Sequence, residues 1–299
     1  MKKKIALLFT LLLTFPSLPS YSKEATFEKR IEKEIVCPKD FTQNPAVYFY
    51  CIYRDYHNYK FDDGIEKAQK ALKEIEPLLK KSPEAKVPNA EKGKAKLRDP
   101  RVKSVASDLH LLLGMLYFQK AVNLKDTKAK KVYEEFFSKL EKKGFNFFQI
   151  NELMELYTEK TLLPESFSKE KEKRFKELLS KMGVTEEDLE SLVKKAQKFS
   201  EETAKLKFSY LQRALKEFQT AVRIDPENAL AYYQLGNFYS GALGENLPET
   251  SQAAEEAYYK AALLLKKKGD LAGYKEVVKK LEMLNPSSQY LKKLKGKDA

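Results

Sequence analysis

Small and bulky apolar residues alternate at helical spacing between residues 210 and 261. Ala214, Phe218 and Ala221 follow one another at intervals of four and three, and Pro226 comes five residues later. Intervals of three and four place side chains on one face of a helix, and small residues let two helix backbones approach closely. A proline cannot continue a helix, so a turn is expected just before it. The pattern predicts two closely packed helices joined by that turn.

A second set of residues continues the pattern after the turn. Tyr232, Leu235, Gly236 and Tyr239 follow at intervals of three, one and three. Together the two sets resemble the tetratricopeptide repeat (TPR), a helix-turn-helix unit of about 34 residues with an aromatic, Leu-Gly and Tyr on its first helix and Ala, an aromatic, Ala and a closing Pro on its second. The resemblance implies an all-α fold, an α-α superhelix of such hairpins. Two ordinary amphipathic helices would share the periodicity but not this order of small and large residues.

The first 22 residues are expected to form a secretory signal peptide. Three consecutive lysines precede an apolar run over 5–13, and prolines and small residues follow up to Ser22. The apolar run is about half of the roughly 20 residues that a membrane-spanning helix needs. We therefore expect cleavage near Ser22 and a soluble, exported bacterial protein in the periplasm. A retained membrane anchor is the less favoured alternative.

Cys37 and Cys51 are the two cysteines of the chain. In an oxidising compartment such a pair most often forms a disulfide, here joining the segment before the first helix to that helix. Closing a loop of this size contributes about 3 kcal/mol in the chain-entropy model. Two buried free thiols and a redox-active pair are the alternatives, and a redox-active pair usually has C-x-x-C spacing, which is missing.

Residues 23–81 hold a weaker copy of the repeat. Its second helix is expected to end at Pro77, and Tyr53 stands where the family has a small residue, so a capping hairpin is expected rather than a regular unit. The residues that match the repeat are Phe49, Ile52, Tyr56, Gly64, Ala68 and Ala71.

Two basic segments lack the repeat pattern. Residues 82–103 contain three prolines, a glycine and seven basic against three acidic residues, with almost no large apolar side chain. Such a segment cannot bury enough surface to offset its ordering entropy, so a flexible loop is expected. The tail at 287–299 carries four lysines and is expected to be loosely attached.

Between these segments the repeat is interrupted. Residues 104–125 read as a first repeat helix that resumes at Ser104, but no partner helix follows directly. We expect a helical insert at 126–200 that splits one repeat, and further repeats at 201–286, with an irregular turn from Ser240 to Gln252. Alternatively, each half pairs with diverged helices inside the insert. The first-helix signature consists of His110, Leu113, Gly114 and Tyr117.

The insert carries its own folding signals. Gly144 and Gly183 suit helix C-termini, and Thr185 with Asp188 suits the start of a helix as a capping box. Its dense apolar residues are expected to form a separate core, with a docking face as the alternative. They are Phe136, Phe137, Phe145, Phe147, Phe148, Leu153, Leu156 and Tyr157.

The net charge and the few candidate catalytic residues limit the classes of function that fit this sequence. The formal charge is +13, and removal of the three signal lysines leaves +10, which favours anionic partners. Seven of the 56 basic residues are arginine, the residue that base reading and phosphate clamps prefer, so no specific nucleic acid is expected. Two histidines and two cysteines form no catalytic or metal-ligand set of recognisable spacing. We therefore expect no enzyme activity, no metal and no cofactor.

The family resemblance implies a binding face. Stacked hairpins curve so that the first helix of each unit lines a concave groove. Carried over position by position, the groove residues are Leu230, Tyr233, Asn237 and Ser240 in one unit and Asp108, Leu111, Met115 and Phe118 in the other. Tyrosine, asparagine and phenylalanine suit a groove that holds a peptide by ring contacts and hydrogen bonds. Alternatively, these residues pack against the insert.

The expected function is that of an adaptor or scaffold that binds a protein or peptide partner in envelope assembly, secretion or appendage biogenesis. The alternative is a protein that binds polyanions or an anionic membrane surface through residues 82–103 and the tail. The sequence does not specify an oligomeric state.

Overall fold

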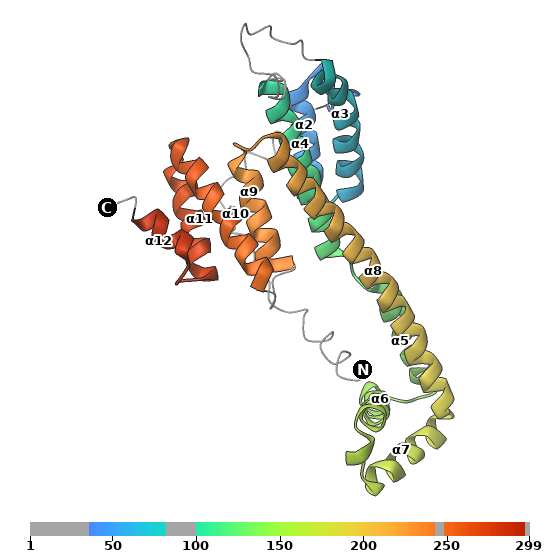
Figure 1. The fold of residues 1–299 in the computed structure, drawn as a ribbon. Helices are drawn as coiled ribbons and strands as arrows, with labels where there is room; N and C mark the ends of the chain where they lie inside the picture. Colours follow the sequence, from blue (N-terminus) through green and yellow to red (C-terminus); the bar gives the residue numbers. More distant parts are fainter. Residues whose placement is uncertain (1–35, 82–99, 243–247, 297–299) are drawn as a thin grey trace, which may run out of the picture. The chain divides into compact units, whose positions relative to one another are not determined.

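The computed structural model describes residues 36–81, 100–242 and 248–296, which form helices joined by short connections (Figure 1). This part of the chain contains no β-strand, and the predicted all-α fold of TPR-like hairpins is confirmed. Across the described ranges, every helix is too short or too polar to cross a bilayer. The predicted signal peptide at 1–22 and residues 82–99 of the predicted basic loop lie outside the described residues.

The helices follow one another in a simple order. They are α2 (Pro45–His57), α3 (Phe61–Lys81), α4 (Pro100–Asn123), α5 (Thr127–Glu141), α6 (Phe147–Leu162), α7 (Lys169–Met182), α8 (Glu186–Ile224), α9 (Ala229–Asn237), α10 (Pro248–Lys267), α11 (Leu271–Leu284) and α12 (Gln289–Lys295). Three short turns, η3 (Phe41–Gln43), η4 (Pro164–Ser166) and the π-helical η5 (Phe238–Ala242), complete the described elements. The chain divides into two compact units, residues 1–51 and 52–299.

In the first unit a disulfide holds the segment before α2. Cys37 and Cys51 are bonded as predicted, with their Cα atoms 6.0 Å apart. Phe41 of the same segment is buried, and its ring packs edge-on against Tyr48 and Phe49 of α2, with ring centroids 5.7 Å apart in each case. A covalent bond and an aromatic cluster therefore both attach this segment to the helix.

Two prolines behave differently from the sequence prediction. α3 does not end at Pro77 but continues to Lys81. A proline removes one backbone donor, and the buried residues before it, Ala71 and Ile75, still hold the helix against its neighbour α4. α4 begins at Pro100 rather than at Ser104, so residues 100–103 are helical and not part of a loop. Proline suits the first helical position because its fixed φ is helical and its missing N–H is not needed there.

The repeat pairs are α4 with the second half of α8, and α9 with α10 (Figure 1). In each pair a glycine of the first helix faces an aromatic ring of the second. A Cβ atom on Gly114 would lie 2.7 Å from the ring of Phe218, and one on Gly236 would lie 2.6 Å from the ring of Tyr258. Carbon atoms do not pack this closely, so only glycine fits. The order of small and large residues in the sequence therefore determines the packing of both pairs.

α8 is one continuous helix from Glu186 to Ile224. The boundary predicted at residues 200 and 201 lies within it, because the segment contains no Pro or Gly to end the helix. The helix begins with the predicted capping box: Asp188 N donates to Thr185 Oγ1 at 3.1 Å, and Thr185 N donates to Asp188 Oδ2 at 2.9 Å. The insert and the repeats therefore share one element.

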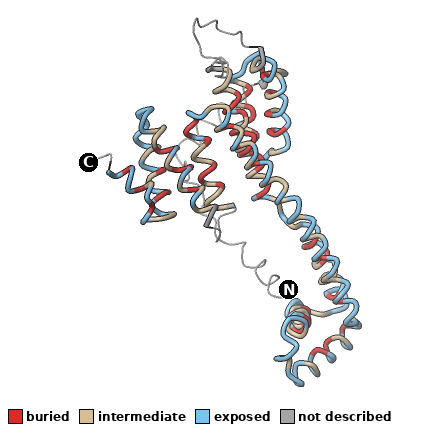
Figure 2. The backbone as a smooth tube through the Cα atoms, viewed as in Figure 1, coloured by how far each residue is buried: buried red, intermediate tan, exposed pale blue. Residues whose placement is uncertain are grey.

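The insert consists of α5, α6, α7 and the first half of α8, with α5 lying along α8. Asp126 accepts a hydrogen bond from Ala129 N at 3.1 Å and further bonds from the hydroxyls of Ser200 and Thr203, so it ties the start of α5 to α8. Figure 2 shows buried residues recurring along these helices. The core they form contains Leu140, Ile150, Leu153, Leu156, Tyr157, Phe175, Leu178, Met182 and Leu189.

The dense apolar residues of the insert divide into two groups. Six of them lie in or against this core: Leu153, Leu156, Tyr157, Phe136, Phe137 and Phe145. The other two, Phe147 and Phe148, are 56% and 80% exposed. Helical spacing places Phe148 on the face of α6 opposite Ile150 and Leu153, so the prediction that it belongs to the core is wrong.

Four helix ends share one turn geometry. In each, a residue with positive φ is followed by an N–H that donates to the carbonyl five residues back: Lys60 to Asp55 after Tyr59, Phe145 to Leu140 after Gly144, Val184 to Leu179 after Gly183, and Asp270 to Leu265 after Gly269. For a residue other than glycine this left-handed conformation costs about 1–2 kcal/mol of conformational energy, because its Cβ atom lies too close to the following carbonyl oxygen. Among the described turns of this kind, Tyr59 is the exception.

The end of the chain is better packed than the sequence predicts. Leu291 and Leu294 of α12 are buried in a core shared with α10 and α11, and Ser288 before α12 donates a hydrogen bond to Glu255 of α10. The predicted loose tail at 287–299 is therefore wrong for residues up to 296, because two leucines three residues apart give α12 a buried face among exposed lysines. α10 also begins at Pro248, inside the turn predicted to extend to Gln252.

Candidate peptide-binding face

The first helices of the repeats are connected through α9. α4 contacts α9, and Tyr233 of α9 donates a hydrogen bond of 2.7 Å from its hydroxyl to Glu276 Oε1 of α11. Burial and the neighbouring Glu276 carboxylate raise the pKa of Tyr233, so the phenol keeps its proton and acts as a donor. Leu230, one turn earlier, is 51% exposed. Leu230 and Tyr233 therefore combine an exposed apolar side chain with a tyrosine held by a hydrogen bond.

Asn237 and Ser240, at the end of α9 and in η5, surround the hydroxyl of Tyr258 of α10. Tyr258 Oη donates to Asn237 Oδ1 at 2.9 Å and lies 3.0 Å from Ser240 Oγ. Burial raises the pKa of Tyr258, which keeps its hydroxyl protonated and able to donate to Asn237. The polar atoms predicted for the groove are therefore held in place by contacts with α10, and Asn237 and Ser240 remain partly exposed.

Asp108 belongs to a polar junction between repeats. Asn228 Nδ2 donates to Asp108 Oδ1 and to Ser107 Oγ, both at 2.9 Å, and Asn228 Oδ1 accepts from Ala231 N at 3.0 Å. Ser107 in turn donates to the carbonyl of Ala221 at 2.9 Å. Burial is the main cause that raises the pKa of Asp108, although its side chain retains contact with solvent. The junction fixes α9 relative to α4 and the end of α8.

Ser107 and Asn228 are buried polar residues of the site that the sequence pattern did not single out. The available signal was Asn228 directly before Ala229, since asparagine is a preferred N-cap residue. Glu276 and Met283 of α11 were missed as well, because α11 lacks the repeat signature. They are seven residues apart on α11, and Met283 is 70% exposed. α11 therefore adds a carboxylate that contacts Tyr233 of α9 and, about two turns further along α11, an exposed apolar side chain.

The α4 residues of the predicted groove do not form one exposed row. Leu111 is 4% exposed, so its prediction as a groove residue is wrong. Phe118 packs edge-on against Phe238, with ring centroids 5.8 Å apart, and Met115 is half-buried. α4 lies among α3, α8 and α9, and these neighbours cover much of its surface. The exposed part of the predicted groove is therefore centred on α9.

The insert is packed mainly against itself. α5, α6 and α7 make their principal contacts with one another, with η4 and with α8. One hydrophobic cluster of the insert draws on α5 to α8, and a second draws on α5 and α8. Three residues of the predicted groove, Tyr233, Asn237 and Ser240, instead contact α10 and α11. For these three residues the structure therefore does not support the alternative in which the groove packs against the insert.

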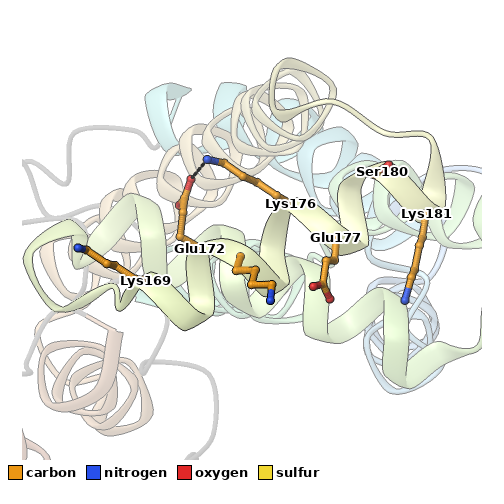
Figure 3. Close-up of a pocket in the computed structure, with 7 residues that line it drawn as sticks. Lys169, Glu172, Lys176, Glu177, Ser180 and Lys181 are labelled. Carbon is orange, nitrogen blue, oxygen red and sulfur yellow. Dashed lines mark ion pairs between the residues drawn. The ribbon is translucent and has the colours of Figure 1, made fainter.

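Two hollows on the described surface lie on the insert. One, of about 610 Å³, follows α7 and is lined by Lys169, Glu172, Lys173, Lys176, Glu177, Ser180 and Lys181. Figure 3 shows these side chains along a single helix, with Lys176 paired to Glu172 at 3.1 Å. The other, of about 400 Å³, follows α6 and includes Met154, Leu162 and Leu163. Side chains spread along one helix do not converge on a small ligand.

The histidines have structural contacts. His110 Nδ1 lies 2.5 Å from Glu217 Oε2 and connects α4 to α8. His57 packs edge-on against Tyr53, with ring centroids 4.2 Å apart. Within the described ranges, no three His, Cys, Asp or Glu side chains are grouped so that they could hold a metal ion.

A model of the TPR repeat family matches residues 211–241. The match covers the end of α8, the junction at Asn228, all of α9 and most of η5. No curated protein matches the chain. The predicted repeat is thus supported at the point where Phe218 and Tyr233 lie, and such repeats generally mediate binding to protein partners.

Proposed function

We propose that this protein is a non-catalytic adaptor that binds a protein or peptide segment on the exposed face of α9 and α11. The observation that carries the proposal is the match to the TPR repeat family at 211–241, which contains α9, the first helix of the second pair, with Leu230 exposed and Tyr233 partly exposed. An extended segment would meet apolar side chains at Leu230 and Met283. It would also meet polar groups at Asn237 and Glu276. Pre-positioned polar groups reduce the ordering cost of binding.

We further propose that the adaptor works in the periplasm, in envelope assembly, secretion or appendage biogenesis. The support is the signal-like start of the sequence and the disulfide between Cys37 and Cys51, which persists in oxidising compartments. Binding of polyanions through 82–103 and the tail has less support, because residues 100–103 and 289–295 are helical and α12 is packed.

Site-specific photocrosslinking in the native host tests the binding face. A benzoylphenylalanine at Leu230 is expected to yield a discrete adduct with a partner protein, and the same group at Lys173, an exposed residue of α7, is expected to yield none. Tyr233→Ala should abolish the Leu230 adduct while the circular dichroism spectrum stays helical. Equal adducts from both positions, or an adduct that Tyr233→Ala does not change, would contradict the proposed face.

The location has a separate test. N-terminal sequencing of the protein purified from the host should show a mature chain that begins near Ser22. A chain that retains Met1 and fractionates with cytosolic markers would contradict export and leave the binding face untouched.

A further inference from the structure

The turn between α2 and α3 contains a residue that the fold does not favour. Tyr59 has a φ of 58° and is the only non-glycine residue with positive φ in the described chain. The other three turns with the same hydrogen bonds have glycine at this position. The Tyr59 side chain is 71% exposed, so little packing compensates for its backbone conformation. A bulky residue kept in a strained, exposed position indicates a role other than stability.

Further aromatic side chains gather around this turn. Tyr59 packs edge-on against Phe61 at 5.8 Å, and Tyr53 stacks on Tyr56 at 6.2 Å between ring centroids. The two groups of rings are adjacent, because Tyr59 N donates a hydrogen bond to the carbonyl oxygen of Tyr56 at 3.3 Å. His57 contacts Tyr53 and Tyr56. These five residues, Tyr53, Tyr56, His57, Tyr59 and Phe61, form an aromatic patch.

The exposed polar groups around the patch include hydrogen-bond donors from four residues. Tyr59 contributes a hydroxyl, His57 a ring nitrogen, Asn58 an amide and Lys60 an ammonium group, and all four residues are exposed. Of the two nearby carboxylates, Asp62 is already paired with Lys120 of α4, and Asp63 lies in the first turn of α3. The surface therefore offers flat rings together with donors.

A proline-rich segment has the complementary chemistry. Prolines present flat apolar rings and carbonyl acceptors but no backbone N–H, and a run of prolines is already ordered as a polyproline II helix before it binds. Binding domains recognise such segments through aromatic side chains. A polyanion fits less well because Lys60 is the one Lys or Arg among the exposed residues from Tyr53 to Asp63. We propose that the aromatic patch binds a proline-rich segment of a partner protein in the polyproline II conformation, and that Tyr59 is retained for this contact.

The test combines stability and binding in the same variants of the full chain. Tyr59→Gly should raise the melting temperature by about 2–4 °C, because it removes the backbone strain. The same change should weaken binding of a fluorescently labelled, capped decaproline peptide by at least about tenfold in an anisotropy titration, because a ring contact is lost. Tyr53→Ala should also weaken decaproline binding, because it removes a ring of the aromatic patch without changing the backbone of the turn. Phe148→Ala, at an exposed ring of the insert, is the matched control and should change neither result.

Three results would overturn the inference. One is a wild-type protein that binds decaproline no better than a Gly-Ser decapeptide. Another is Tyr59→Gly lowering the melting temperature, which would make the ring structural. The third is binding of a chitooligosaccharide in place of decaproline, which would assign the patch to sugars. None of these results bears on α9 and α11, so this inference and the proposed function fail separately.

Discussion

Glycine serves different purposes in the repeat pairs and in the insert. In the pairs, Gly114 and Gly236 have helical backbones and leave space for the rings of Phe218 and Tyr258. In the insert, Gly144 and Gly183 have positive φ, and no atom of a neighbouring residue would clash with a side chain there. The repeat pairs therefore depend on the space that glycine leaves, and the insert depends on its backbone freedom. The two regions should respond differently to the same substitution.

The largest effect is expected in the core of the insert. Phe175 is fully buried, with its ring 6.4 Å from that of Tyr157, and Phe175→Ala should cost about 3–5 kcal/mol of folding free energy. Hydrogen exchange measured by mass spectrometry should show lost protection in α6 and α7 and retained protection in α9 to α11. Phe148→Ala, which removes an exposed ring, should leave the hydrogen exchange of these helices unchanged. Equal loss of protection in both regions would mean that the insert has no separate stability.

The glycine comparison predicts an intermediate effect. Gly236→Ala should cost about 2–3 kcal/mol, because the added Cβ would force the ring of Tyr258 to move. Gly183→Ala should cost about 1–2 kcal/mol through backbone strain alone. Urea unfolding curves of both variants give the two values. A second change, Tyr258→Leu, should recover part of the loss in Gly236→Ala and none in Gly183→Ala, and equal recovery in both would remove the distinction.

The smallest effect is expected at the junction between repeats. Asp108 has a raised pKa in the folded chain, so its contribution to stability is fully present below its unfolded pKa of about 3.9 and is lost as the pH rises through the higher folded value. Asp108→Asn keeps an oxygen that can accept from Asn228 and removes the charge. It should stabilise the protein at neutral pH by a few tenths of a kcal/mol at most, because solvent screens the group. Near pH 3 the variant and the parent should unfold at the same urea concentration, and a difference only there would contradict the assignment.

The sequence predicts the repeat pairs because the order of small and large residues on each helix is local. Gly114 and Gly236 stand in the first-helix signature, and Phe218 and Tyr258 stand in the second-helix signature, so the faces that meet could be identified although the insert and an irregular turn separate the paired helices. The capping box at Thr185 and the turn at Gly183 were predictable for the same reason, since each depends on a few neighbouring residues.

Long-range burial was not predictable from the same pattern. Leu111 occupies a groove position in the repeat signature, yet neighbouring helices bury it. Leu291 and Leu294 lie among lysines, and only the fold reveals that α10 and α11 cover them. The partners of Tyr233 and Asp108 come from α11 and from the loop before α9, at separations that no local spacing encodes.

Because α8 is one uninterrupted helix, its length determines which of its sides faces the core of the insert and which faces the core of the repeats. Ala196 packs in the insert and Ala214 in the repeats, and the 18 residues that separate them make about five full helical turns. Ala196 and Ala214 therefore lie on the same side of α8. One extra residue between these two positions would turn the downstream stripe by about 100°, whereas about two whole turns would nearly restore it. Evolution can thus lengthen this connection in whole-turn steps far more readily than by single residues.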